Sequence, residues 1–371
     1  MEVLDSGWLT TGPKAHLFEE RFAEKVGARH AIALNSATAA LHLALEAVGV
    51  GPEDEVIVPT WTFAASAEVV VYRGARPVLV DVDRRTLNAT PEAVLAAVTP
   101  RTRAVIAVHI AGRPLEIERL VELLEPRGIA VVEDAAHAFP SRIGGPAGRY
   151  AGTIGRAGAY SFYATKTITT GEGGMLVTDD DAIADRARIL SLHGISRDAW
   201  KRYSASGSWY YEIEDAGYKY NMTDIAAALG LVQLERAEEL LQARRELAKT
   251  YSTRLRESSV SDLVEIPEDA PDGSHAWHLY VLRMHMDHLK VDRGRVIDEL
   301  KQKGIGTSVH FIPLHLHPYY RRRWGYAPGD FPVAAEEYER VVSLPLWPGM
   351  SVTDIERVTN ALEAVLESLR R

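Results

Sequence analysis

Between about residue 30 and residue 180, short apolar runs alternate with longer stretches in which apolar residues have helical spacing. The runs are HAIAL (30–34), EVIVP (55–59), PVLVDVD (77–83), AVIAVHI (104–110), IAVVEDA (129–135), GAYSF (158–162) and GMLVT (174–178). Near-continuous apolar strands separated by helices are typical of a mostly parallel sheet covered on both faces. The pattern predicts an α/β domain with such a sheet between helices.

Polar residues mark where several helices should begin. Thr90 is expected to cap a helix whose first residue is Pro91. The stretch from Thr223 to about Arg256 has the spacing of one long helix. The last helix opens at SVTD (351–354), which resembles a capping box, and continues to about residue 368.

A second, smaller domain is expected near the C-terminus. SSVSDLVEIPEDAPDGS (258–274) is rich in Pro, Asp and Ser, as junctions often are. After it, HLYVLRM (278–284) and GTSVHF (306–311) are predicted strands, and residues 292–304 a predicted helix. We therefore expect a large domain over residues 1–250 and a small α+β domain over residues 251–371, with a ligand site in the cleft between them.

Composition and charge narrow the classes of function. The 371-residue chain has a net charge of −9, which argues against a general nucleic-acid binder. It contains no cysteine, which excludes disulfides, thiolate catalysis and cysteine metal sites. No run of about 18 apolar residues and no export signal is visible, so we expect a cytoplasmic protein without a membrane partner.

One lysine stands inside an aromatic, threonine- and glycine-rich segment, SFYATKTITTGEGG (161–174). Most lysines are solvated surface residues, and the segment alone leaves that interpretation open for Lys166. A lysine withdrawn from water is disfavoured in its charged form, and its amine can then attack carbonyl carbons. Because the following glycines allow the backbone to approach a ligand closely, Lys166 is a candidate nucleophile.

A carboxylate ends one of the predicted strands. Asp134 lies at the end of the apolar run in VVEDAAHA (131–138), where open α/β sheets place groups that contact ligands. A buried carboxylate needs a cationic or hydrogen-bonded partner, and a protonated pyridine nitrogen would serve. The alternative is an Asp that caps a helix starting at Ala135. His137 would share the face of Asp134, or it is a core or rim histidine.

Two further segments could contact a ligand. In LNSATAALHLAL (34–45), the hydroxyls of Ser36 and Thr38 stand at the start of a predicted helix, where free N–H groups bind anions, although ordinary capping is equally consistent. Neither a P-loop nor a G-x-G-x-x-G is present. Trp61 and Phe63 follow a strand end, where one could stack on a flat ring, although such aromatics are more often core residues.

Together these candidates supply an amine nucleophile, a carboxylate, an anion-binding helix start and an aromatic side chain for stacking, all on segments of one predicted sheet. A pyridoxal 5′-phosphate site requires the same four parts: a lysine that forms a Schiff base, an acidic partner for the ring nitrogen, a phosphate cup and a ring stack. The residues therefore point to this cofactor as one hypothesis.

The sequence resembles the DegT/DnrJ/EryC1/StrS family of sugar aminotransferases over essentially its whole length. The blocks that carry the resemblance, in order, are GPKAHLFEERFAE, NSATAALHLAL, DEVIVPTWTF, PVLVDVD, VEDAAHA, SFYATKTITTGEGGMLVT, HGISRD, GYKYNMTDIAAALG, GIGTSVHFIPLH and SLPLWPGMS. It looks most similar to the branch that aminates C4 of nucleotide-linked 4-keto sugars, which contains UDP-4-amino-4-deoxy-L-arabinose aminotransferase. Two departures are that the chain starts almost at the block SGWLTTGP (6–13), and that Tyr163 stands where histidine is more common.

The resemblance implies a pyridoxal phosphate enzyme of fold type I that works as a homodimer with active sites shared across the interface. It implies that Lys166 bonds to the cofactor, that Asp134 pairs with the pyridine nitrogen and that His137 contacts the 3-oxygen side of the ring. It places Ala37, Thr38 and Ser161, beside Ser36, at the phosphate, and Phe63 (or Trp61) on the ring. It implies that Lys219 and Asn221 reach the cofactor phosphate of the partner subunit. The sugar would be contacted by Trp8, Thr10 and His310.

The expected reaction is transfer of an amino group from L-glutamate to a nucleotide-linked 4-keto sugar, with Lys166 as general base and acid and with pyridoxamine 5′-phosphate formed during turnover. One alternative is a sugar dehydratase of the same family, in which the lysine position is commonly His. A second is a non-catalytic sensor or binding protein on the same fold. A third is a metal-dependent hydrolase using His310, His315 and His317, for which no carboxylate ligand is evident; we expect no metal.

Overall fold

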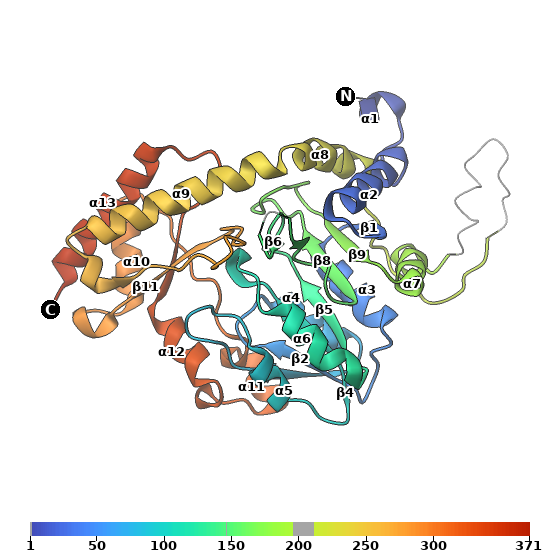
Figure 1. Cartoon of the computed structure of the whole chain (residues 1–371), viewed down its shortest axis with the longest axis horizontal. Helices are drawn as coiled ribbons and strands as arrows, with labels where there is room; N and C mark the ends of the chain where they lie inside the picture. Colours follow the sequence, from blue (N-terminus) through green and yellow to red (C-terminus); the bar gives the residue numbers. More distant parts are fainter. Residues whose placement is uncertain (1, 146, 196–210) are drawn as a thin grey trace.

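The computed structural model describes residues 2–145, 147–195 and 211–371 (Figure 1). The block HGISRD (193–198) extends past residue 195, so its last residues lie outside this description. Within the described residues, seven strands form one sheet in the order β1-β9-β8-β5-β4-β2-β3. They are β1 (His30–Leu34), β2 (Glu55–Pro59), β3 (Arg76–Val80), β4 (Thr102–Val108), β5 (Ala130–Asp134), β8 (Ala157–Ser161) and β9 (Gly174–Thr178).

The sheet is mostly parallel. Neighbours among β8, β5, β4, β2 and β3 run parallel, whereas β9 lies antiparallel to both β8 and β1. The predicted α/β class with a mostly parallel sheet is confirmed. Because parallel strands need crossover connections, helices cover the two faces.

The alternation along β1 shows how the two faces are filled. Ile32 and Leu34 belong to the core under α3 (Ala37–Ala47), α4 (Ala64–Tyr72) and α7 (Asp181–Ser191). Ala31 and Ala33 face the other side and pack with α2 (Pro13–Val26) and α8 (Asp224–Glu235). The other helices of this part of the chain are α1 (Glu2–Ser6), α5 (Pro91–Ala96) and α6 (Ile117–Leu124), and a short hairpin comprises β6 (Arg142–Ile143) and β7 (Arg149–Tyr150).

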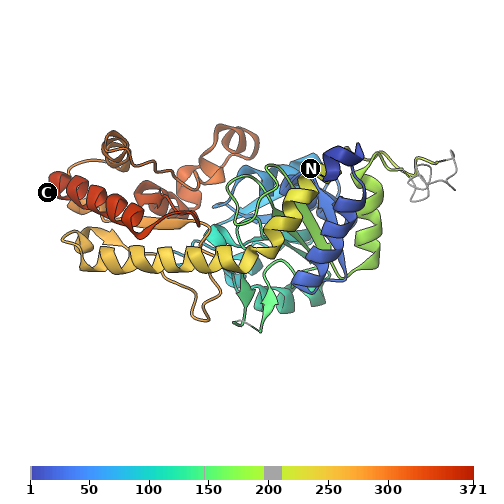
Figure 2. The ribbon, with the colours of Figure 1, turned by 90° about the horizontal axis from the view of Figure 1, so that it is seen from above.

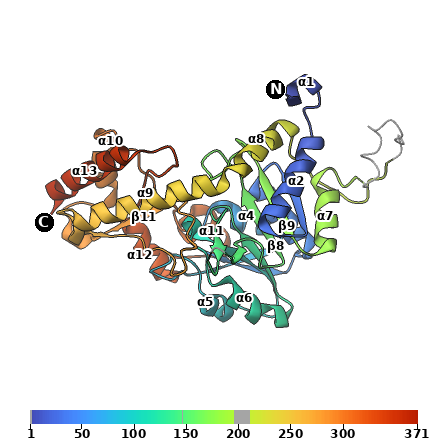
Figure 3. The ribbon, with the colours of Figure 1, turned by 45° about the horizontal axis from the view of Figure 1, so that its top comes forward.

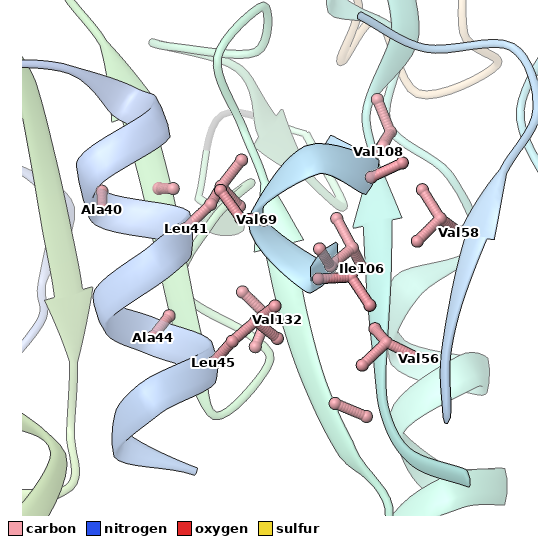
Figure 4. Packing of buried hydrophobic residues seen from close by; sticks show 14 of the residues in the cluster. Ala40, Leu41, Ala44, Leu45, Val56, Val58, Val69, Ile106, Val108 and Val132 are labelled. Atoms are coloured by element: carbon pink, nitrogen blue, oxygen red, sulfur yellow. The ribbon is translucent and has the colours of Figure 1, made fainter. Parts of the chain in front are cut away.

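Helix α3 lies deep in the large domain because its side chains are apolar on almost every face. Residues 39–45 of this helix are all buried. Figure 4 shows Leu41 and Leu45 pointing toward the side chains of Val69 from α4 and Val132 from β5. The N-terminus of α3 is thereby held at a fixed place above the sheet.

The small domain has its own core. Its three-stranded sheet has the order β10 (Val264–Glu265), β11 (Tyr280–Met284), β12 (Val341–Leu344), and α9 (Ala237–Glu257), α10 (Arg293–Gln302) and α13 (Val352–Leu369) pack against it. Helices α11 (Pro318–Trp324) and α12 (Pro332–Arg340) instead contact the large-domain core through Tyr320 and Ala334. Figures 2 and 3 show α9 extending from the large domain to the small one, with the N-terminus on the large domain and the C-terminus at the far end of the small one.

Most predicted elements are present, with two corrections. The single helix expected from Thr223 to about Arg256 is two helices, α8 and α9, which meet at Arg236. The segment GTSVHF (306–311) is not a strand: Ser308 makes one isolated bridge to Ser343. Helix α9 runs through residue 250, so the division into 1–250 and 251–371 falls within a helix and stays a prediction.

The predicted helix starts at Thr90 and Ser351 are confirmed. The Thr90 hydroxyl accepts a hydrogen bond from the N–H of Ala93, and Ser351 and Asp354 form a reciprocal capping box. Among the helices of the described segments, none has the length and apolarity that a membrane crossing requires.

Candidate active site

A cavity of about 540 Å³ lies at the carboxyl ends of β5 and β8. Side chains of the large domain form most of it, and three residues that follow the junction, His278, His310 and Phe311, close the other side. The sequence-predicted residues that it brings together are Ser36, Ala37, Thr38, Phe63, Asp134, His137, Ser161, Lys166 and His310.

Lys166 stands in the loop that joins β8 to β9. The start of the loop is tied to its end by two backbone hydrogen bonds: the N–H of Phe162 donates to the carbonyl oxygen of Gly173, and the N–H of Thr170 donates to the carbonyl oxygen of Phe162. The lysine is half-buried and its side chain lines the cavity. Burial lowers the pKa of Lys166 to about 8, although the carboxylate of Asp134 acts to raise it. The amine is therefore neutral for a much larger fraction of the time near physiological pH than an ordinary lysine is.

Asp134 is buried at the end of β5 and is held by a hydroxyl that sequence reasoning missed. Ser66 Oγ donates to Asp134 Oδ2 at 2.7 Å, and Ser66 and Thr62 share a further hydrogen bond of 2.8 Å. The N–H of Ala136 donates to the other carboxylate oxygen at 3.2 Å. No helix starts at Ala135, where a turn follows instead, so the interpretation of Asp134 as a helix cap is wrong.

Two histidines face each other beside Lys166. The rings of His137 and His278 are 4.4 Å apart, and His137 also stacks on Phe311. Burial, reinforced by the charge of Lys166, holds the pKa of both imidazoles well below the usual value. Nδ1 of each ring is buried and has no hydrogen-bond partner within the described residues, as expected where a ligand group completes a site.

His278 was not a sequence candidate. It is the first residue of the run HLYVLRM (278–284), whose apolar pattern predicts a strand and indicates no ligand contact. Its place is fixed from two sides: Arg244 donates to its carbonyl oxygen at 3.2 Å, and Gly112 lies so close that an added Cβ would be 3.1 Å from the backbone nitrogen of His278. A polar residue opening an apolar run was the only available signal.

The first turn of α3 forms one end of the cavity. Ser36 caps the helix by accepting from the N–H of Ala39 at 3.1 Å. Gly174, the first residue of β9, lies so close that an added Cβ would be 2.3 Å from the carbonyl carbon of Ser36. Free N–H groups of this turn, with the hydroxyls of Thr38 and Ser161 on the cavity wall, make a cradle suited to an anion.

Aromatic and imidazole rings line the rest of the cavity. Phe63 is 60% exposed and its ring lies 5.7 Å from that of Phe311. Trp61, the second choice for a ring stack, is fully buried and donates to the carbonyl oxygen of His310 at 3.1 Å, so it does not line the cavity. Tyr163 is half-exposed at the cavity wall.

Four predicted residues lie outside this cavity: Trp8, Thr10, Lys219 and Asn221. Lys219 Nζ donates to Asn221 Oδ1 at 2.6 Å, and Asn221 Nδ2 donates to Thr11 Oγ1 at 2.7 Å. The carbonyl oxygen of Thr10 accepts from the N–H of Asp224. The N-terminal block and the segment GYKYN (217–221) are therefore joined to each other, and these four side chains do not line the cavity of their own chain.

The histidines proposed for a metal site have separate partners. His310 Nδ1 pairs with Ser343 Oγ at 2.9 Å, and His315 Nδ1 with Thr60 Oγ1 at 2.8 Å. Across the described ranges, no cluster of three or more His, Asp or Glu side chains is placed to hold a metal ion.

The cavity suits a flat, anionic compound that carries an aldehyde and a basic ring nitrogen. A partly neutral lysine amine and a buried carboxylate stand on one side of the space, a helix N-terminus with three hydroxyls forms one end, and aromatic rings flank it. The unpartnered Nδ1 atoms of His137 and His278 leave hydrogen-bonding capacity for such a compound. These are the requirements of pyridoxal 5′-phosphate.

Comparison with known proteins agrees with this fit. A model of the DegT/DnrJ/EryC1/StrS aminotransferase family matches residues 1–363. The spore coat polysaccharide biosynthesis protein SpsC of Bacillus subtilis (strain 168) is 49% identical over 367 residues, which are 99% of this chain and 93% of SpsC.

Solved structures give the same result. The putative sugar aminotransferase Spr1654 from Streptococcus pneumoniae, in its PMP form, superposes with a TM-score of 0.90 at 33% identity, covering 99% of this chain and 95% of that one. DesV of S. venezuelae, in complex with a ketimine intermediate, gives a TM-score of 0.87 at 34% identity, covering 99% and 92% of the two chains.

The fold and these relatives define a pyridoxal phosphate-dependent aminotransferase, whose cofactor alternates between the pyridoxal and pyridoxamine forms. More particularly, the chain belongs to the DegT/DnrJ/EryC1/StrS family, whose solved members include sugar aminotransferases. The predictions of family, fold, enzyme class and cofactor are confirmed.

Proposed function

We propose that this enzyme moves an amino group from L-glutamate to the keto carbon, at C4, of a nucleotide-linked keto-deoxy sugar. The product would enter a glycan or an amino-sugar natural product, and the enzyme would work in the cytoplasm. The observation that carries the proposal is the placing of Lys166 and Asp134 in one cavity with the cradle at the start of α3. The similarity to SpsC, a spore coat polysaccharide biosynthesis protein, supports a sugar substrate.

Each cavity residue has a proposed role toward the cofactor. Ser36, Ala37, Thr38 and Ser161 hold the phosphate, Phe63 covers the ring, and His137 meets its 3-oxygen side. Asp134, oriented by Ser66, keeps a proton on the ring nitrogen. When bound, the cofactor supplies an electron sink for the carbon that loses a proton.

Lys166 performs the proton transfer in this proposal. Its amine would hold the resting cofactor, and the same amine would act on the substrate proton once the amino donor occupies the site. With its pKa lowered to about 8, the free amine can accept a proton from the substrate carbon and return it as an acid at the same pH. His310, on the opposite wall, would contact the sugar.

A homodimer is part of the proposal. Ile225, Leu229 and Val232 lie at i, i+4 and i+7 on α8 and are 42%, 54% and 59% exposed, so they form one apolar stripe. Contiguous exposed apolar surface of this kind commonly marks an interface. Lys219 and Asn221, which do not line the cavity of their own chain, would then reach the cofactor phosphate of the partner subunit. Trp8 and Thr10, on the same surface, would contact the partner's sugar.

The other readings of the family are less well supported. In the related dehydratases the lysine position is commonly His, whereas this chain has Lys166. A non-catalytic sensor performs no proton transfer, so it would not require a lysine with a lowered pKa in the same cavity as Asp134.

The test uses the purified enzyme loaded with pyridoxal phosphate. Lys166→Ala should abolish turnover and the near-visible absorbance of lysine-bound cofactor, whereas Lys249→Ala, an exposed lysine of α9, should change neither. Retained transamination in Lys166→Ala would contradict the proposed role. The pyridoxamine form is then incubated with UDP-, dTDP- and GDP-linked 4-keto and 3-keto sugars. Amination of 3-keto sugars only would overturn the C4 assignment, and no amination of any nucleotide sugar would overturn the substrate class.

A further inference from the structure

The segment from Tyr218 to Asn221 is fixed to the large domain through its backbone. The N–H of Asn35, just before α3, donates to the carbonyl oxygen of Tyr220 at 2.7 Å, and the N–H of Tyr220 donates to Ser191 O at 2.8 Å. Single bridges pair Asn221 with Leu34 and Lys219 with Leu192. The segment is therefore extended, and alternate side chains point to opposite sides.

One side of the segment packs on a buried histidine of α3. His42 is 4% exposed, its Nδ1 shares a 3.0 Å hydrogen bond with the hydroxyl of Tyr220, and its ring lies 4.8 Å from that of Tyr218. The two tyrosine rings stack 4.9 Å apart at an interplanar angle of 10°. Tyr72 of α4 meets the His42 ring edge-on at 5.6 Å.

The other side carries the functional pair. Lys219 and Asn221 alternate with the two tyrosines and are hydrogen-bonded to each other. A stacked, hydrogen-bonded row on one side of an extended segment restricts the backbone, and this restriction limits where the side chains on the opposite side can reach. The Lys219 side chain is flexible, so a fixed backbone reduces the number of conformations that must be lost when its ammonium binds a ligand.

We infer that His42 and Tyr220 are positioning residues for the cofactor site of the partner subunit. This inference rests on the proposed function, in which Lys219 and Asn221 bind the partner's cofactor phosphate. The same helix carries Ser36, Ala37 and Thr38 at its first turn and His42 in its next turn. Each α3 thus contributes to two cofactor sites: its N-terminus to the site of its own chain, and His42, through Tyr220, to the site of the other.

The sharpest test is a heterodimer with a single Lys166, made from two differently tagged chains. One chain carries Lys166→Ala, so the near-visible absorbance of lysine-bound cofactor reports only the site of the other chain. Tyr220→Phe retains the stacked ring and removes only the hydroxyl. It is placed either on the Lys166→Ala chain, whose segment reaches the reporting site, or on the Lys166 chain, whose segment does not.

With Tyr220→Phe on the Lys166→Ala chain, the pyridoxal phosphate dissociation constant of the reporting site should rise about fivefold, as loss of one hydrogen bond implies. On the Lys166 chain it should leave that constant unchanged. Tyr72→Phe is the matched control, since its hydroxyl points to Glu68 and makes no bond to His42. His42→Phe, placed like Tyr220→Phe, should repeat the result provided that its melting temperature equals that of the parent.

Lys219→Ala on the Lys166→Ala chain tests the sharing of sites separately from the positioning role of Tyr220. If it leaves the reporting site unchanged, the proposed sharing of sites fails, and the inference fails with it. If Lys219→Ala weakens binding but Tyr220→Phe does not, sharing stands and the positioning role is overturned. If Tyr220→Phe weakens cofactor binding at the reporting site only when it is on the Lys166 chain, the positioning role is also overturned. The hydroxyl would then act on the phosphate cradle of its own subunit.

Discussion

The hydroxyl of Ser66 donates a 2.7 Å hydrogen bond to the carboxylate of Asp134, which ties α4 to the end of β5 inside the cavity. Ser66 is itself fully buried and is oriented by Thr62. A buried carboxylate with one side-chain donor has a defined direction, which is what pairing with a ring nitrogen requires.

Ser66→Ala should therefore slow catalysis more than it destabilises the fold. A hydrogen bond to a carboxylate contributes about 1.5–3 kcal/mol, so we expect kcat to fall about tenfold or more. Steady-state kinetics measures this. Ser252→Ala is the control: Ser252 shares a 3.0 Å hydrogen bond with Tyr280 in the small domain, and its loss should leave kcat unchanged. Equal kcat losses in the two variants would contradict a specific role for Ser66.

The ionisation of Lys166 predicts how the cofactor-free enzyme captures pyridoxal phosphate. Since burial lowers the pKa of Lys166 to about 8, the neutral amine, and with it the capture rate, should rise with pH and level off above about 8. An ordinary lysine, with a pKa of about 10.4, would give a rate that still rises beyond that point. Stopped-flow absorbance between about pH 6 and about pH 10, a range chosen around the two pKa values, measures the midpoint of the rise in capture rate.

Asp134→Asn shifts this midpoint in a defined direction. The Asp134 carboxylate acts to raise the pKa of Lys166, so its replacement by a neutral amide should lower the pKa and move the midpoint to lower pH. An unchanged midpoint would show that the Asp134 charge does not act on Lys166, and an upward shift would contradict the predicted sign. Circular dichroism of both proteins checks that the fold is unchanged.

Gly174→Ala should damage the phosphate cradle. The new Cβ would lie 2.3 Å from a backbone atom of Ser36, so β9 and the first turn of α3 must separate. We expect pyridoxal phosphate to bind at least about tenfold more weakly and the melting temperature to fall, because overpacking costs about 1–3 kcal/mol. Gly51→Ala, which adds a Cβ to open space, should change neither quantity. Normal binding by Gly174→Ala would place the phosphate elsewhere.

The apolar stripe of α8 predicts the oligomeric state. Val232→Glu puts a carboxylate into the proposed apolar interface. Burying this charge without a partner costs free energy that the remaining contacts of the stripe do not offset, so association is weakened. Sedimentation velocity should show monomers or a much weaker dimer. Val352→Glu, on the small domain at 57% exposure against 59% for Val232, serves as the matched control and should remain dimeric. A Val232→Glu protein that remains fully dimeric would locate the interface away from α8, and dissociation of both variants would show that the effect is not specific to this stripe.

The fold could be predicted to a large extent because local patterns decide it. The strands at residues 30–34, 55–59 and 174–178 have the bounds that their apolar runs indicated. Sequence periodicity failed where geometry rather than polarity decides. The break at Arg236 lies inside uninterrupted helical spacing, and residues 306–311 alternate like a strand but find only one bridging partner, at Ser343.

The site was predicted less completely, for a physical reason. Lys166 and Asp134 stood out because a charged residue beside an apolar strand needs an explanation. Ser66 did not, since a serine inside a helix is unremarkable until its partner 68 residues away is known. His278 was missed similarly, because its meaning depends on the ring of His137 that faces it. Pairings between distant segments are outside what a local pattern can indicate.

Asp224 connects the start of α2 to the start of α8. Its carboxylate accepts from the N–H groups of Gly12, Lys14 and Ala15, which are 212, 210 and 209 residues away in the chain. During synthesis on the ribosome, α2 therefore cannot acquire this cap until residue 224 has emerged. At about 5–20 residues per second, that interval is roughly 10 to 40 s. For that time α2 of the nascent chain is without its native N-terminal partner.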